Sequence, residues 1–156
     1  MLLVRELSRF KKMSALERGI LIRALLLLPA IGLGLRIFGF KRVQAILTVS
    51  KTFDTCKLAP NVTLKIAVAV ASVVSIAARR GFYRANCLPT SLVLEHLIQK
   101  QGIAADLRVG VRKVAGALEA HAWVEHYGQP LNDGMDVHER FPAFNQPIHP
   151  RKRTLD

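Results

Sequence analysis

The sequence predicts an α+β fold in which helices fill the first half of the chain and a small antiparallel sheet follows. Apolar residues recur every three or four positions in several segments before residue 100, which is the spacing of one helical face. Residues 107–111 and 119–125 instead alternate apolar with polar residues, as a strand with one buried face does. Helices followed by strands are typical of α+β domains.

Length and composition fit a single domain. A chain of 156 residues with 51% hydrophobic content can bury a core and is too apolar for disorder. Residues 1–86 hold 15 Lys and Arg against three Asp and Glu, whereas residues 87–156 hold eight of each. We therefore expect a basic helical half over residues 1–80, a core that carries the chemistry over 81–140, and a tail over 141–156.

The basic half has three interpretations. A solvated surface is the simplest. Basic residues that alternate with apolar helix also suit anionic lipid headgroups, which predicts at most a weak association with a membrane surface. The pI near 10.5 would suit nucleic acid, but the sequence has no recognition motif or interleaved aromatic residues, so we expect no specific nucleic-acid binding.

The first predicted helix has a clear start. Residues 1–13 form a short basic lead-in, and Ser-Ala-Leu-Glu at residues 14–17 has the pattern of a capping box. We expect the helix to run over residues 18–28 and Pro29 to kink or break it. A shorter helix and a connection are expected over residues 41–60.

Residues 19–35 are hydrophobic enough to raise the question of a membrane span or a signal peptide. Arg23 lies inside this segment and Arg36 closes it, which leaves an apolar run of 12 residues where a span needs about 20. Residues 36–42 offer no small-residue cleavage site. We expect a buried or surface-lying helix, with a transmembrane helix as the alternative.

A second long helix is expected after residue 60, with Asn61 or Thr63 as its cap and residues 79–81 as its end. Its broad apolar face comprises Ile66, Val70, Val73, Val74 and either Ala77 or Ala78. A strand is the competing interpretation because the segment is rich in valine, but its length and its alanines favour a helix.

Cys87 lies where the next helix should begin. The apolar face of this helix comprises Leu88, Leu92, Val93, Leu97 and Ile98. The helix should end by Gly102, and Pro89 fits its first turn. Unpaired N–H groups and the helix dipole stabilise a thiolate at such a position, so Cys87 is a candidate nucleophile. A cysteine is more often a small buried hydrophobe, and this interpretation is kept for Cys56.

The strand over residues 119–125 carries the candidate base. His121, Trp123 and Glu125 share one face, and a loop at residues 113–118 precedes the strand. Trp123 is expected either to wall the site or to fill the core.

The partner of His121 depends on the hairpin that follows. A three-residue loop at residues 126–128 would place His121 opposite Asp133. A two-residue turn would pair Asp133 with Ala122 and point it to the other face. Tyr-Gly is not the Asn-Gly or Asp-Gly that two-residue turns prefer, so we predict the longer loop, with Asp136 as the substitute partner.

The remaining titratable side chains are expected to have no catalytic part. An odd separation along a strand would put His126 and His121 on opposite faces, so we expect no zinc site. The others are expected to be solvated, paired at the surface or in irregular chain: His96, His138, His149, Glu95, Glu119 and Glu125.

The combined motifs resemble those of the lasso-peptide biosynthesis B2 proteins. The similar motifs are Asn-Cys-Leu-Pro-x-Ser-Leu from Asn86, Gly-Ile-x-Ala-x-Leu-x-x-Gly-Val-Arg from Gly102, and Ala-His-Ala-Trp-Val-Glu-x-x-Gly with Leu-Asn-Asp. B2 proteins are transglutaminase-like cysteine proteases that remove the leader from a ribosomally made precursor. The resemblance is close over residues 79–134 and looser over the helical half. It implies a transglutaminase-like or papain-like core with Cys87 as nucleophile, His121 as histidine and Asp133 as aspartate.

The resemblance also implies partners. They are the precursor peptide, a separate leader-recognition (B1) protein, since the chain has no room for a fused one, and an ATP-dependent macrolactam synthetase. We expect a cytoplasmic peptidase without cofactor or metal, and two cysteines without a disulfide framework fit that reducing compartment. The alternatives are a noncatalytic basic membrane-associated or adaptor protein, and a related thiol acyltransferase.

Overall fold

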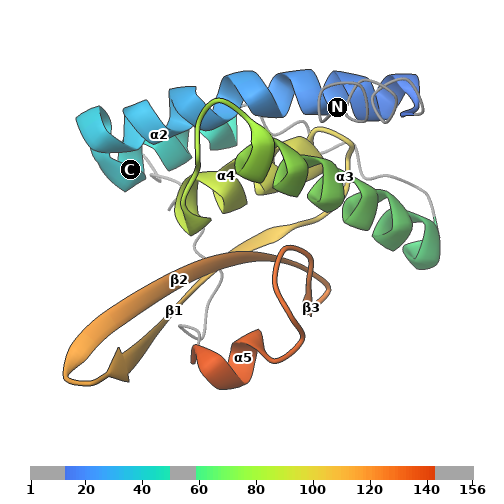
Figure 1. Ribbon diagram of the computed structural model, residues 1–156. Helices are drawn as coiled ribbons and strands as arrows, with labels where there is room; N and C mark the ends of the chain where they lie inside the picture. Colours follow the sequence, from blue (N-terminus) through green and yellow to red (C-terminus); the bar gives the residue numbers. More distant parts are fainter. Residues whose placement is uncertain (1–12, 50–58, 143–156) are drawn as a thin grey trace, which may run out of the picture.

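A computed structural model describes residues 13–49 and 59–142. Its elements are α2 (Ala15–Val49), α3 (Pro60–Arg80), α4 (Cys87–Gln99), β1 (Asp106–Val114), β2 (Ala117–His126), β3 (Gln129–Pro130) and α5 (Val137–Arg140). Helices α2, α3 and α4 pack together, with α2 uppermost in Figure 1, and the antiparallel sheet, in the order β1-β2-β3, lies below them. The predicted α+β fold is confirmed. The predicted lead-in up to residue 12, Cys56 and most of the predicted tail, including His149, lie outside the described residues.

The start of α2 follows the predicted capping box. The Ser14 N–H donates to Glu17 Oε2 at 2.7 Å, and the Glu17 N–H donates to Ser14 Oγ at 3.2 Å. The prediction that Pro29 breaks this helix is wrong, because α2 continues through it, and the alternative of a kink there stays a prediction. Proline costs a helix one hydrogen bond, and the burial of Leu28 and Ile31 in the core on either side of it offsets that loss.

The interruption of α2 lies at Gly39 instead. This residue has φ 75° and ψ 170°, a backbone conformation that is essentially restricted to glycine. The segment after it, residues 40–49, corresponds to the shorter helix predicted in this region. Val43 and Gln44 are buried, so the segment remains attached to the core beyond the break.

α3 has the predicted apolar face but a different start. It begins at Pro60 with Ala59 as its N-cap, so the predicted caps at Asn61 or Thr63 are wrong. Proline is well suited to a first helical position because its φ is preset. The buried side chains of the predicted face are Val70, Val73, Val74, Ala77 and Ala78. The helix ends where predicted, and the Gly81 N–H closes it with a 2.8 Å bond to the fourth carbonyl before it.

α4 is packed between the other helices and the sheet, in contact with α2, α3, β1 and β2. Its fully or almost fully buried side chains are Leu92, Val93, Leu94, Leu97 and Ile98. Such coverage overturns two predictions of surface positions. Glu95 is buried and accepts a bond from Gln99 Nε2 at 3.2 Å, and His96 is half-buried. Burial lowers the pKa of His96, and the charge of Lys100 lowers it further.

β1 and β2 form one long hairpin. Its two-residue turn at residues 115–116 has φ 49° and 87°, so the predicted loop at 113–118 is mostly strand. The register pairs Gly110 with His121. A Cβ at Gly110 would lie 2.8 Å from the carbonyl oxygen of Phe141, so glycine here lets the segment after α5 pack directly on β1.

The second hairpin differs from the prediction. Its turn is the two-residue Tyr127-Gly128, with φ 48° and 78°, so the predicted three-residue loop is wrong. The paired residues are Glu125 with Pro130 and His126 with Gln129. Two consecutive positive φ values are those of the type I′ turn, which suits the twist of the strands.

His126 explains why β2 extends to the turn. Its Nδ1 lies 2.6 Å from the Ala104 carbonyl oxygen, and its Nε2 lies 3.1 Å from Thr63 Oγ1. The ring is buried and also contacts the Tyr127 ring at 4.5 Å between centroids. These contacts hold His126 in the strand, so the turn begins one residue later than predicted.

Two helical segments are long and apolar enough to cross a membrane by length and composition alone. The 18-residue window tested within residues 15–47 has a mean hydropathy of 2.0, and the one within residues 60–80 has 1.8. Core helices of soluble proteins pass the same test, and 28% and 44% of the two windows are buried inside the molecule. Composition alone therefore allows a core helix or a membrane helix for each.

Candidate active site

Cys87 is the first residue of α4, as predicted. Asn86 precedes it in an extended conformation, and the backbone N–H and the Oγ1 of Thr90 both donate to the Asn86 carbonyl, at 3.2 and 2.8 Å. Pro89 occupies the first turn, where a proline costs no intrahelical bond. The Cys87 thiol is free and half-buried. The sulfur therefore lies at the helix end whose N–H groups have no intrahelical partner.

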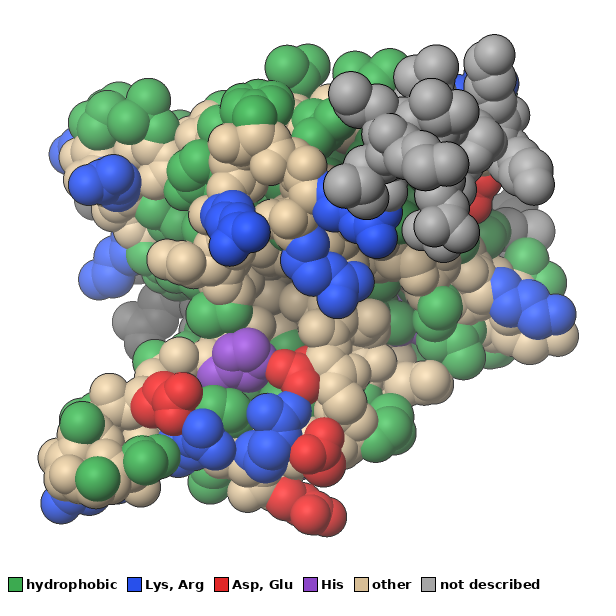
Figure 2. Space-filling model, viewed as in Figure 1, with side chains coloured by type: hydrophobic (Ala, Val, Ile, Leu, Met, Phe, Trp, Pro, Cys, Tyr) green, Lys and Arg blue, Asp and Glu red, His purple; other side chains and the backbone are tan. Residues whose placement is uncertain are grey.

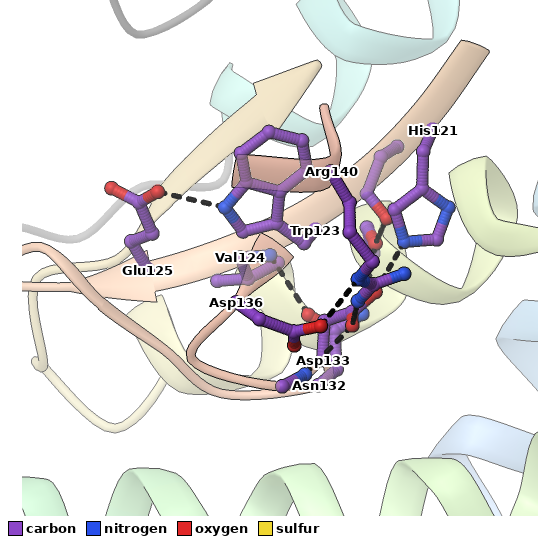
Figure 3. A network of polar contacts seen from close by, with 11 residues as sticks. His121, Trp123, Val124, Glu125, Asn132, Asp133, Asp136 and Arg140 are labelled. Atoms are coloured by element: carbon purple, nitrogen blue, oxygen red, sulfur yellow. Dashed lines mark hydrogen bonds and ion pairs between the residues drawn. The ribbon is translucent and has the colours of Figure 1, made fainter. Parts of the chain in front are cut away.

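His121 lies on β2, and its ring is held from several sides. Its Nε2 is hydrogen-bonded to Asp133 Oδ2 (Figure 3). The Phe141 and Trp123 rings lie 4.9 and 6.2 Å from it between centroids. The His121 side chain is 25% exposed and that of Asp133 is 15% exposed, so the pair is largely shielded but reachable.

The His121–Asp133 contact forms although its predicted register is wrong. The ladder ends after the Leu131 N–H donates to the Val124 carbonyl at 2.9 Å. The N–H of the same residue, Val124, donates to the side-chain oxygen Oδ1 of Asn132 at 2.8 Å instead of to a main-chain carbonyl. The Asn132 side chain thus takes the place of a strand residue. The chain leaves the sheet there, which frees Asp133 from the strand alternation and lets it reach His121.

Asp133 is held as a carboxylate by its neighbours. Burial raises the pKa of this carboxyl, but hydrogen bonds from His121, from the Gly134 N–H at 2.7 Å and from Arg140 Nη2 outweigh that effect. The pKa of Asp133 therefore lies below its ordinary value. A carboxylate that stays ionised can orient an imidazole and stabilise its protonated form.

Arg140 is one of the site residues that the sequence analysis missed, together with Ser91 and Asn132. It pairs with Asp133 and also donates from Nε to Asp136 Oδ2 at 2.8 Å. Asp136, the substitute partner for His121, therefore binds Arg140 instead. The signal was present in the sequence, because an Asp and an Arg four residues apart face each other on a helix.

Ser91 and Asn132 tie α4 to β2. Asn132 Nδ2 donates to Ser91 Oγ at 3.0 Å, and Ser91 Oγ donates to the Ala122 carbonyl at 3.0 Å. Ser91 is one turn after Cys87 on α4, and Ala122 follows His121 on β2. This bridge therefore sets the distance between the elements that carry the thiol and the imidazole.

Ser91→Ala is expected to destabilise the fold by about 1–3 kcal/mol, because it leaves the buried Ala122 carbonyl and the Asn132 amide without their hydroxyl partner. Urea unfolding would measure this loss. Thr90→Ala is the control, since its hydroxyl bonds within its own helix end and is exposed. A loss for Ser91→Ala no larger than that for Thr90→Ala would contradict a bridging role.

Trp123 is a core residue. It is fully buried in a cluster with Val137 and Phe141, and its Nε1 donates to Glu125 Oε1 at 2.7 Å. Glu125 is buried too and pairs with Arg108 at 3.0 Å, so its predicted surface position is wrong.

Of the other side chains predicted at the surface or in irregular chain, Glu119 lies where predicted and His138 does not. Glu119 is exposed and pairs with Arg112 at 2.8 Å, as predicted. His138 lies on α5 rather than in irregular chain, with its Nε2 3.4 Å from a Glu125 oxygen and its ring edge-on to Trp123. Within residues 13–49 and 59–142, His, Cys, Asp and Glu side chains form no group of three that could hold a metal ion.

Two cavities meet at Cys87 and His121. The first, of about 620 Å³, is also lined by Asp133 and by several polar side chains: Ser72, Ser75, Arg79, Thr90 and Asn132. The second, of about 710 Å³, is lined mostly by apolar side chains of α2, β1 and the first turn of α4. The structure thus places Cys87, His121 and Asp133 on the wall of one cavity. A thiol on the same cavity wall as an imidazole that is hydrogen-bonded to a carboxylate is the side-chain set of nucleophilic acyl chemistry.

A family model for the transglutaminase-like superfamily matches residues 27–145. This match covers well over half of the chain, so the chain belongs to the transglutaminase-like superfamily, which includes cysteine proteases and acyltransferases. No curated protein and no solved structure matches the chain. The resemblance drawn from the motifs is therefore confirmed for the superfamily. The predicted division of the chain near residue 80 stays a prediction.

Proposed function

We propose that this protein is a cysteine peptidase that removes the leader from a ribosomally synthesised lasso-peptide precursor. The observation that carries the proposal is that Cys87 and the hydrogen-bonded pair His121 and Asp133 line one cavity, in a chain of the transglutaminase-like superfamily. The choice of substrate rests on the motif resemblance around Cys87 and His121.

The reaction proceeds through a thioester. The Cys87 thiolate attacks the scissile carbonyl, the C–N bond breaks, and protonated His121 gives its proton to the leaving amine. His121 then takes a proton from water, which attacks the thioester and releases the new carboxylate and the thiol. Since Nε2 is bonded to Asp133, Nδ1 is the ring nitrogen that exchanges these protons. The Cys87 N–H at the helix start is one donor for the oxyanion.

The proposed partners follow the same resemblance. A separate leader-recognition protein would present the precursor, and an ATP-dependent macrolactam synthetase would close the ring on the amine that cleavage frees. The proposed location is the cytoplasm, where the thiol of Cys87 stays reduced.

A thiol acyltransferase is the second candidate, because the superfamily includes such enzymes. The two enzymes differ only in the nucleophile that attacks the thioester, which is water in a peptidase and an amine in an acyltransferase. Mass spectrometry of the neighbouring precursor peptide, incubated with this protein, its recognition partner and a small primary amine, separates them. A peptidase gives two fragments whose masses together equal the precursor plus one water, whereas an acyltransferase gives a leader fragment that carries the amine. An uncut precursor would contradict both.

We also propose that α2 rests on an anionic membrane surface. Its large exposed apolar side chains are Leu16, Ile22, Leu26, Leu33, Ile37 and Phe38, with Ile46 beyond the break at Gly39. Exposed arginines flank them at positions 18, 23 and 36. Figure 2 shows apolar side chains along the upper edge, over α2, with Lys and Arg nearby. Each basic residue near anionic lipid contributes about 1 kcal/mol to the free energy of binding. A second copy of the chain on this face would instead bring like charges together.

The opposite side of α2 favours a surface position over a span. Ile20, Ala24 and Leu28 are at most 3% exposed because they pack in the core with α3 and α4. A helix that crossed a bilayer would have to leave this core. The helix therefore lies flat, with one face in the protein and the other toward lipid.

Vesicle flotation tests this position. The protein should float with vesicles of phosphatidylcholine mixed with phosphatidylglycerol, more weakly with phosphatidylcholine alone, and less as salt rises. Leu26→Glu should reduce binding at least about fivefold, while Leu118→Glu, at the 78% exposed Leu118 of the β1–β2 hairpin, should leave it unchanged. Equal losses for both variants, or no flotation by the wild type, would contradict the proposal.

A further inference from the structure

The apolar cavity beside Cys87 is built from five parts of the chain, which are α2, the segment before α4, α4, β1 and β2. Its lining includes Leu35 and Phe40 of α2, Tyr83, Leu88 at the start of α4 and Val109 of β1. Cys87 and His121 belong to the same wall. At about 710 Å³ the cavity is within the size range of ligand pockets. A ligand that fills it would therefore lie against Cys87.

The position of Tyr83 depends on a glycine of α2. A Cβ at Gly32 would lie 2.1 Å from Tyr83 Oη, so the absence of a side chain at Gly32 lets the Tyr83 ring lie against the helix. Gly32 and Tyr83 both line the cavity. Its shape is therefore set by a close contact between α2 and the segment before Cys87.

The two cavities share Cys87 and His121 but differ in the rest of their lining. Beyond these two residues, the apolar cavity has one charged side chain among its lining residues, the exposed Arg36, and all of its lining belongs to the described part of the chain. The other cavity is mixed, because apolar side chains lie among the polar and charged ones of Ser72, Ser75, Arg79, Asn132 and Asp133. A peptide bound at Cys87 with one part in each cavity would thus meet mostly apolar contacts in one and more polar contacts in the other.

The order of the reaction steps indicates which part of the substrate each cavity holds. The water that hydrolyses the thioester must enter the space that the amine has left, because His121 first protonates the amine and then deprotonates the water. The mixed cavity, which contains Asp133 and several other polar side chains, suits a departing amine and an incoming water. We infer that the apolar cavity holds the acyl part of the substrate and binds a bulky apolar side chain within two residues before the attacked carbonyl. This inference rests on the proposed thiol chemistry at Cys87.

Covalent probes test this without turnover. N-acetyl-dipeptidyl chloromethyl ketones present the acyl side of a substrate, and the Cys87 sulfur displaces chloride from them. One series carries leucine or phenylalanine at either position, and the reference series carries glycine, aspartate or lysine. Iodoacetamide, which has no side chain, measures the reactivity of the thiol itself. Intact-protein and peptide mass spectrometry give the rate of modification at Cys87.

Relative to iodoacetamide, apolar probes should modify Cys87 at least about tenfold faster than glycine probes, and lysine probes should be slowest. Ala120→Phe should remove this preference because exposed Ala120 lines the cavity and the larger ring would fill it. Ala117→Phe, on the same strand and likewise exposed, is the matched control and should keep the preference.

The outcomes test the role of the apolar cavity independently of the peptidase proposal. Equal rates for glycine and apolar probes, or a preference that survives Ala120→Phe, would overturn the inference even if the precursor is cleaved at Cys87. A preference that Ala120→Phe removes and Ala117→Phe retains would support the inference, even if the precursor stays intact and the peptidase proposal fails.

Discussion

Cys87→Ala is expected to lower the rate of precursor cleavage by roughly 10⁴-fold or more, because no thioester can form without the thiol. The fold should survive the change, since Cys87 is only half-buried at the first position of α4 and alanine is a good helix former. Single-turnover cleavage with enzyme in excess over precursor measures the rate, and circular dichroism checks the fold.

Cys56→Ala is the matched control, since it makes the same change at the cysteine for which we predict a structural role. It should retain the wild-type rate. A Cys87→Ala variant that still cleaves within about tenfold of the wild-type rate would rule out the nucleophile assignment.

Asp133→Asn is expected to slow cleavage by about 10²–10⁴-fold, less than the loss of Cys87. An amide in place of the carboxylate can donate to His121 Nε2, which would favour the wrong tautomer and no longer stabilise the protonated ring. Asp136→Asn is the control, because Asp136 shares Arg140 with Asp133 but does not contact His121. Equal losses for the two variants would point to Arg140 rather than to the imidazole.

The same carboxylate predicts a dependence of stability on pH. Hydrogen bonds lower the pKa of folded Asp133, so its carboxylate stabilises the fold at neutral pH, and this stability is lost as pH falls through the lowered pKa. The free energy of unfolding of wild type should therefore exceed that of Asp133→Asn at neutral pH and approach it toward about pH 3 and below. Urea unfolding across this range measures the difference. A difference that grows on acidification would contradict the assignment.

The sequence located the candidate site because its signals are local. The spacing of apolar residues and Pro89 placed Cys87 at a helix start, and the alternation around His121 placed the imidazole on a strand. Both needed only neighbouring residues and the periods of regular structure. The capping box at residues 14–17 was predictable for the same reason.

The errors arose where distant packing overrides local preference. Pro29 stays inside α2 because Leu28 before it and Ile31 after it are buried in the core. The turn begins after His126 because that ring is held by Ala104 and Thr63, far away along the chain. The contact of Asp133 with His121 was predicted from a wrong register, and the Asn132 side chain is what makes it possible.

The proposed reaction requires a thioester between Cys87 and the leader. Acid quenching during the first turnover, followed by intact-protein and peptide mass spectrometry, would detect it. We expect a transient mass increase equal to the acyl fragment of the precursor, located on Cys87 and lost after hydroxylamine treatment. An acyl fragment on another residue, or cleavage by Cys87→Ala at the wild-type rate, would contradict it.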